Sequence, residues 1–128
     1  MPQSDGCTIA DATVFVDSRI TLPDWEAPPN PDPSLATQWA DFLEALREHE
    51  AGHQALVMRG AERVRQTLRG VHGPHCEPLR ARADSAAQAV LASIRDDDAR
   101  YDAETRHGAT QGAIWPPASP SPLVVALR

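Results

Sequence analysis

The sequence predicts a small α+β domain in which one or two N-terminal strands accompany a long hairpin of two helices. Its 128 residues are enough for one hydrophobic core but rarely for two. A β-branched segment lies near the N-terminus, and two long stretches follow in which apolar residues recur with the helical period of about 3.6. We therefore expect a single domain over residues 1–115 and a Pro/Ser-rich tail over residues 116–128.

The strand prediction rests on the segment from Cys7 to Leu22, which is rich in β-branched residues, partly alternating and free of proline. Residues 23–33 then contain five prolines in eleven positions. Such a density of proline excludes a helix and favours a stiff loop within the domain.

The first helix is expected to begin near Ser34, whose hydroxyl can cap it, although Asp32 could do the same, and to end at Gly70. The second is expected from about residues 76–77 to near Thr105. The apolar positions of the first helix are Leu35, Trp39, Phe42, Leu43, Leu46, Leu56, Val57, Ala61, Val64 and Leu68. This stripe of hydrophobic residues is interrupted once, between Leu46 and Leu56.

The interruption is the run His49-Glu50-Ala51-Gly52-His53, which places three polar side chains on a core-facing stripe. His49 and His53 lie one helical turn apart, so both imidazoles can take corners of a zinc tetrahedron. Glu50 would lie beside the metal without binding it, where it can take a proton from a zinc-bound water and pass it to a leaving amine. The pattern predicts a Zn²⁺-dependent hydrolase with Glu50 as general base.

A mononuclear site of this kind needs a third protein ligand, with the fourth position left for water. Position 59, where metzincins carry a further histidine, holds Arg59. An antiparallel second helix would return past the motif near its C-terminal end, where Glu104 and His107 lie. Glu104 continues the apolar stripe of that helix, whereas His107 is suitable if the helix ends near Thr105. Spacing leaves both open.

Other features limit the classes of function. The net charge of -6 and the scattered arginines argue against nucleic acid as a partner, and the longest apolar run, Leu123–Leu127, is too short for a membrane-spanning segment. Met1–Gly6 is neither basic nor apolar, so we expect no signal peptide in this chain. Cys7 and Cys76 are compatible by spacing with a disulfide or with two buried thiols. The oligomeric state is not indicated.

Two groups of residues carry a resemblance to a known family. The first is Leu22-Pro23-Asp24-Trp25 with Trp39, Phe42, Leu46 and His49-Glu50-x-x-His53, and the second is Cys76 and Leu79 with Tyr101-Asp102-x-x-Thr105-x-His107-Gly108-x-x-Gln111-Gly112-Ala113. Over about residues 7–115 the chain resembles a bacterial family of predicted secreted zinc-dependent proteases. The two-part signature is far more specific than either half.

The resemblance implies a zincin-like domain that holds Zn²⁺ with His49, His53 and, in preference to Glu104, His107. It also implies a disulfide between Cys7 and Cys76. Members usually have a signal peptide and further strands before the segment at Cys7, so the resemblance and the disulfide together imply a secreted or periplasmic protein.

The signature residues Tyr101 and Asp102 are each open to two interpretations. Tyr101 is a candidate catalytic residue that would donate a hydrogen bond to the developing oxyanion, or it is a core aromatic. Asp102 would orient a ligand imidazole, or it is a surface charge. The run Asp96-Asp97-Asp98 is interpreted as a solvated acidic face.

The expected function is a zinc metallopeptidase that hydrolyses peptide bonds in a peptide or protein substrate. By analogy with other metallopeptidases, Thr13–Val16 would be the edge that pairs with an extended substrate. One alternative is a catalytically silent zinc-bearing binding or scaffold module. Another is a structural helical hairpin without metal.

Overall fold

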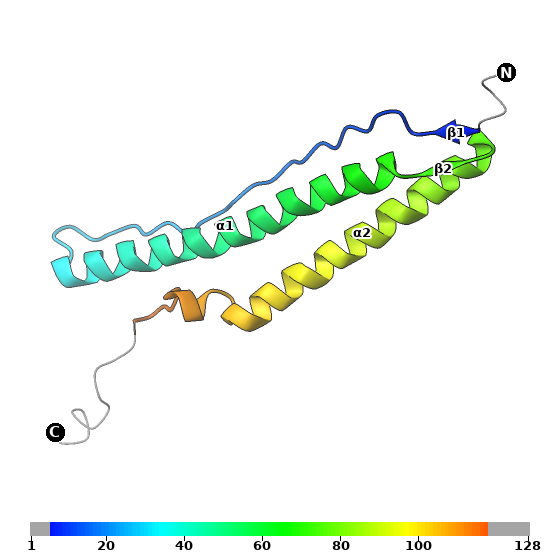
Figure 1. Cartoon of the computed structure of the whole chain (residues 1–128). Coiled ribbons are helices and arrows are strands. Elements are labelled where there is room, and N and C mark those ends of the chain that lie inside the picture. The colour runs from blue at the N-terminus through cyan, green and yellow to red at the C-terminus, as the bar shows by residue number, and fades with distance from the viewer. Residues whose placement is uncertain (1–5, 118–128) are drawn as a thin grey trace. The chain divides into compact units, whose positions relative to one another are not determined.

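The computed structural model describes residues 6–117, in which two long helices form a hairpin beside a small antiparallel sheet (Figure 1). The elements are β1 (Cys7–Thr8), α1 (Pro33–Arg69), β2 (His72–Gly73), α2 (Cys76–Thr105) and a 3-10 turn, η2 (Ala109–Gln111). The predicted α+β fold and its helix hairpin are confirmed. Most of the predicted tail, residues 118–128, lies outside the described residues.

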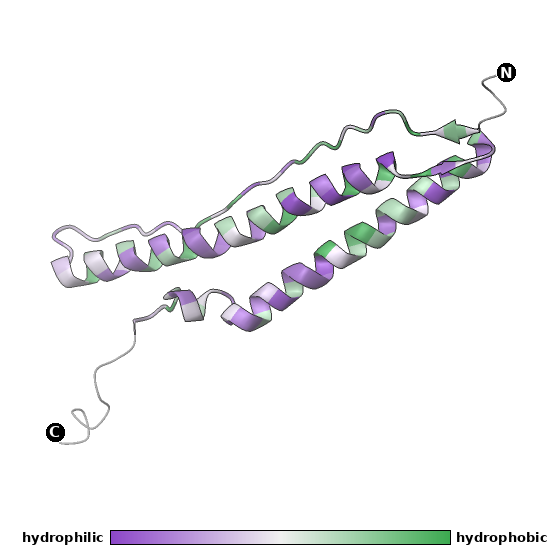
Figure 2. Ribbon diagram, in the orientation of Figure 1, coloured by the Kyte–Doolittle hydropathy of each residue, from purple (hydrophilic) through white to green (hydrophobic). Residues whose placement is uncertain are grey.

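The described chain divides into two compact units, and both helices pass through both. The first unit comprises residues 6–19 and 52–101, and the second comprises residues 20–51 and 102–117. Figure 2 shows hydrophilic and hydrophobic positions interleaved along both helices, as the helical periodicity predicts.

The start and end of α1 follow from local chemistry. The Ser34 backbone N–H donates to Asp32 Oδ1 at 2.9 Å, so the capping side chain is Asp32 and not Ser34. Pro33 occupies the first helical position, where its fixed φ is favourable and its missing N–H costs nothing. The helix ends at Arg69, and the following Gly70 N–H donates back to the Gln66 carbonyl at 3.2 Å.

The sheet joins the N-terminal segment to the turn between the helices. Cys7 pairs with Gly73 and Thr8 with His72 in antiparallel register. A disulfide links Cys7 to Cys76, the first residue of α2, which confirms the pairing that the family resemblance implied.

The strand expected between Cys7 and Leu22 is much shorter than predicted, because only β1 finds a partner. Directly after β1, the Ile9 N–H donates to the Val71 carbonyl at 3.4 Å. Residues 12, 14 and 16 are half-buried and residues 11, 13, 15 and 17 exposed, which is the alternation of a strand. No second strand pairs with them among residues 6–117, so Thr13–Val16 lies outside the sheet.

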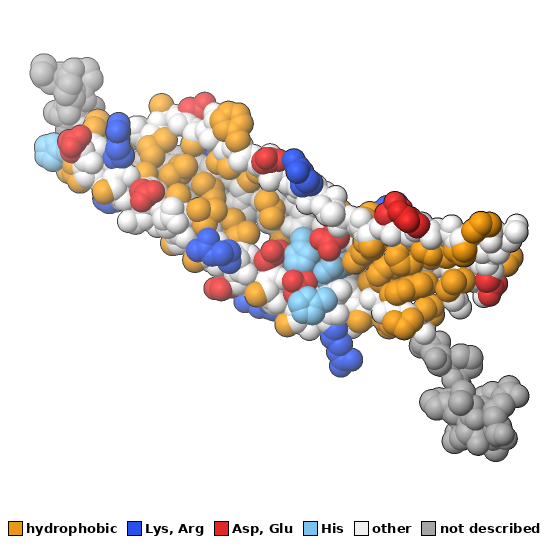
Figure 3. Space-filling model, turned by 180° about the vertical axis from the view of Figure 1, so that it is seen from behind, with side chains coloured by type: hydrophobic (Ala, Val, Ile, Leu, Met, Phe, Trp, Pro, Cys, Tyr) orange, Lys and Arg blue, Asp and Glu red, His pale blue; other side chains and the backbone are white. Residues whose placement is uncertain are grey.

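Each unit has its own apolar contacts. In the first, Val64 and Leu79 are buried. In the second, an aromatic cluster has neighbouring ring centroids 4.9–6.1 Å apart and comprises Trp25, Trp39, Phe42 and Trp115. Many hydrophobic side chains remain visible on the face shown in Figure 3. Even so, neither helix of the described chain is long and apolar enough to cross a membrane.

Candidate metal centre

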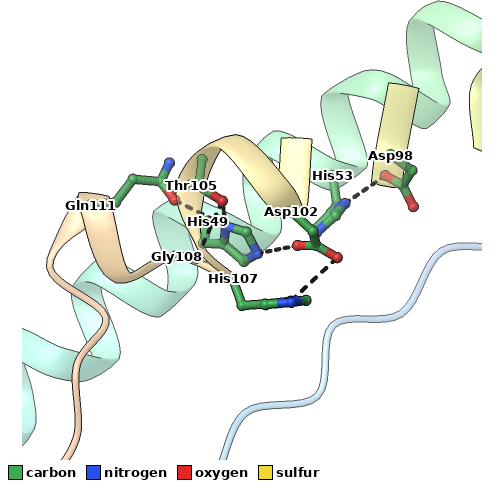
Figure 4. Close-up of polar contacts among 8 residues, drawn as sticks. All are labelled: His49, His53, Asp98, Asp102, Thr105, His107, Gly108 and Gln111. Carbon is green, nitrogen blue, oxygen red and sulfur yellow. Dashed lines mark hydrogen bonds and ion pairs between the residues drawn. The ribbon is translucent and has the colours of Figure 1, made fainter. Parts of the chain in front are cut away.

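His49 is the most enclosed polar side chain in the described chain, with 3% of its surface exposed. Its Nε2 atom lies 2.9 Å from Asp102 Oδ1, and its Nδ1 atom lies 2.9 Å from Gln111 Oε1 (Figure 4). Both ring nitrogens therefore have polar partners, as a buried imidazole requires. His49 interrupts the apolar stripe of α1, and its two ring nitrogens have the polar partners that burial demands.

The C-terminal end of α2 brings these partners to His49. Arg106 and His107 have φ angles of 51° and 55°, and Gly108 has a φ of 94°, so the chain leaves the helix through three successive left-handed residues. This conformation turns the chain into η2, from which Gln111 reaches His49. Gly108 also permits close packing, because a Cβ atom there would lie 3.1 Å from His49 Cγ.

Thr105 completes the surroundings of His49. Its hydroxyl oxygen lies 3.4 Å from His49 Nδ1 and accepts the Gly108 backbone N–H at 3.3 Å. The second half of the sequence signature therefore builds a cradle around the first histidine, which comprises Asp102, Thr105, Gly108 and Gln111.

His53, one turn later on α1, has different neighbours. Its Nδ1 atom lies 2.5 Å from Asp98 Oδ1, and the Tyr101 ring stands edge-on to the imidazole with centroids 4.8 Å apart. Gly52 makes room for this tyrosine, since a Cβ atom at position 52 would lie 2.0 Å from Tyr101 Oη. The small residue inside the motif is thus explained by a contact with the Tyr-Asp half of the signature.

Three of these residues form a group that could hold a metal ion. One ligand atom from each of His49, His53 and Asp102 lies within 4.8 Å of the others. Two imidazole nitrogens and one carboxylate oxygen are donors that zinc accepts, and the same set suits other divalent transition metals. Figure 3 shows histidine and acidic side chains gathered on one face. The residues fit a metal ion without defining which one.

Comparison with known proteins places the chain in a family. Residues 1–108 match the family described as bacterial protein of unknown function (DUF922). The chain belongs to this family. No curated protein and no solved structure matches it. The match shows a bacterial family, as the resemblance implied, whereas the zinc-protease activity and the two-part signature stay predictions for this DUF922 member.

The predicted third ligand lies at the edge of the group. His107 Nδ1 is 3.7 Å from Asp102 Oδ2, and its side chain is 82% exposed. Glu104 is also exposed. The metal-binding group of the described chain contains Asp102 in place of either residue, and ligation by His107 stays a prediction.

The remaining predicted residues are placed as follows. Glu50 is half-buried and directly follows His49 in α1. His72 and His75 are exposed, in and beside the turn between the helices.

Sequence reasoning did not assign roles to Asp98 and Gln111, which hold the two histidines. The Asp96-Asp97-Asp98 run is more than a solvated face, because Asp98 contacts His53. One signal was present in the sequence: residues 98 and 102 have the same four-residue spacing as His49 and His53, so both aspartates share a helix face.

Proposed function

We propose that this DUF922 protein is a zinc-dependent peptidase centred on His49 and His53. The observation that carries the proposal is the 2.9 Å approach of His49 Nε2 to Asp102 Oδ1 inside the group of three ligand atoms. An imidazole lone pair and a carboxylate oxygen repel each other unless a proton or a metal ion lies between them. Glu50 directly follows His49 in α1, which is the position of the general base in the motif.

His49, His53 and Asp102 would hold the ion, and His107 is close enough to Asp102 to join or replace it. A zinc ion at this position would supply the Lewis acidity that makes a hydroxide nucleophile accessible near neutral pH. Gln111 and Thr105 would keep the His49 ring in place, which is the supporting role that polar neighbours of metal ligands usually have.

The chain's own residues would manage the protons. Glu50 accepts a proton from the attacking water and returns it to the amine nitrogen as the peptide C–N bond breaks, so that no net proton is gained or lost. Tyr101, whose ring stands against His53 and whose hydroxyl lies over Gly52, would donate a hydrogen bond to the carbonyl oxygen as negative charge develops there.

Metal analysis of the full chain tests the first half of the proposal. We expect about one zinc ion per chain in the wild type and a loss of bound zinc in His49→Ala and His53→Ala. Comparison of Asp102→Ala with His107→Ala identifies the third ligand, since only the ligand's removal should lower the zinc content strongly. A metal-free wild type would instead indicate that the His49 Nε2–H donates a hydrogen bond to Asp102 in place of metal binding, and would reject the proposal.

Peptide cleavage tests the second half. The zinc-loaded wild type should cleave members of a peptide library, and Glu50→Gln should retain zinc but lose cleavage by a factor of about 10²–10⁴. Glu48→Gln is a matched control, because Glu48 is an exposed carboxylate two residues earlier on the same helix. Unchanged cleavage in Glu50→Gln would reject the mechanism, and a zinc-loaded wild type without cleavage would indicate a binding or scaffold module.

A further inference from the structure

Asp98 differs from its neighbours in the acidic run. Asp97 lies 3.6 Å from an Arg63 nitrogen and 3.4 Å from an Arg100 nitrogen, as expected of a surface charge. Asp96 is exposed. Asp98 instead directs Oδ1 to within 2.5 Å of His53 Nδ1, although its side chain is 42% exposed. A carboxylate that water can reach is thus directed at an imidazole.

This contact favours a proton on Nδ1 of His53. An ionised carboxylate is only an acceptor, so the Nδ1 atom facing it must donate a proton. The lone pair of the neutral ring is then on Nε2, the nitrogen on the opposite side. The Tyr101 ring, edge-on to the imidazole at 4.8 Å, restricts rotation of the same ring.

We propose that Asp98 is a positioning residue that fixes the tautomer and orientation of His53, so that Nε2 is the atom offered to a metal ion. The part that concerns metal affinity rests on the proposed function. The part that concerns the tautomer does not, because it is argued from the contact between Asp98 and His53 and can be measured without metal.

Zinc affinity measured by competition with a chromophoric chelator tests the first part. Removal of a carboxylate that accepts the ring N–H of a metal-bound histidine weakens metal binding by roughly 10–100-fold. We expect Asp98→Ala to weaken zinc binding by a factor in this range. Asp98→Asn keeps an oxygen acceptor and should fall between wild type and Asp98→Ala. Asp96→Ala is the matched control and should bind zinc as the wild type does. An affinity of Asp98→Ala within twofold of the wild type would overturn the proposal.

The nitrogen chemical shifts of the His53 ring, measured by NMR in the metal-free full chain at a pH where the ring is neutral, test the tautomer itself. His53→Ala assigns the signals. We expect the Nδ1–H form in the wild type and in Asp96→Ala, and a shift towards Nε2–H in Asp98→Ala. A wild-type ring in the Nε2–H form would overturn the inference even if zinc binds. The Nδ1–H form in a chain that binds no zinc would support the tautomer assignment and reject the proposed metal site.

Discussion

His49 and His53 occupy equivalent places in one motif, yet their surroundings are opposite. His49 is buried, and its partners come from the end of α2 and the following turn. The His53 side chain is 19% exposed, and its partner is a carboxylate whose side chain is 42% exposed. The difference teaches that two candidate metal ligands in one helix turn can be held by different means: His49 by enclosure in the fold, and His53 by a carboxylate neighbour at the surface.

The largest difference between the two histidines is expected when each imidazole is removed from the metal-free protein. We expect His49→Ala to lower the free energy of unfolding by about 3 kcal/mol, because it leaves a cavity and removes the partner of two polar side chains. His53→Ala should lower it by about 1 kcal/mol, since water can reach the groups left behind. Urea denaturation in the presence of a chelator measures both.

Both substitutions should abolish zinc binding, although they lower the free energy of unfolding by different amounts. The two measurements together therefore separate the role of each histidine in stability from its role in metal binding. The comparison fails if the two variants lose equal stability without metal, because His49 would then have no structural role beyond that of His53. A circular dichroism spectrum of each variant establishes that α1 and α2 remain folded before the unfolding curves are compared.

The helices could be predicted closely from the sequence, whereas the partners of the histidines could not. Helical periodicity, the candidate caps Asp32 and Ser34, and Gly70 predicted α1 to within about one residue at each end, because these signals are local. The short pairing of β1 with β2 depends on a distant turn, and no local pattern indicates it.

The site shows the same limit. His49 and His53 follow from spacing on a single helix, but the role of Gln111 depends on a turn in which Arg106 and His107 adopt left-handed conformations. Only Gly108 in that turn is a residue type that favours such a conformation. Asp98 could not be separated from Asp97 without knowing which helix face meets His53.

A substitution in the cradle of His49 should have the next largest effect. Gly108→Ala places a Cβ atom 3.1 Å from both His49 Cγ and Ala113 Cβ at a φ of 94°, so we expect a loss of about 2 kcal/mol in unfolding free energy and weaker zinc binding. Gly112→Ala is the matched control. It has a similar φ of 101°, but its Cβ would lie at an ordinary 3.4 Å from Ala45 Cβ.

We expect Gly112→Ala to cost about 1 kcal/mol through backbone strain alone and to leave zinc affinity unchanged. Thermal unfolding and chelator competition on both variants measure the difference. Equal losses of zinc affinity in the two variants would show that backbone strain lowers the affinity, and that the close approach of Gly108 to His49 does not.

The smallest effect is expected on the His53 side, where Gly52→Ala should displace Tyr101. Alanine stabilises a helix by about 1 kcal/mol relative to glycine. At position 52, however, its Cβ would lie 2.0 Å from Tyr101 Oη, so the tyrosine ring must move. We expect these effects nearly to cancel, giving a net loss of less than about 1 kcal/mol. Peptide cleavage should fall if Tyr101 assists the reaction as proposed.

A double-mutant cycle with Tyr101→Ala isolates the contact. In the Tyr101→Ala background the clash is absent, so Gly52→Ala should stabilise the chain by about 1 kcal/mol through helix propensity alone. Effects of Gly52→Ala that are the same in both backgrounds would mean that Tyr101 does not rest on Gly52. His53 would then be held by Asp98 without the tyrosine, which would sharpen the contrast with the enclosed His49.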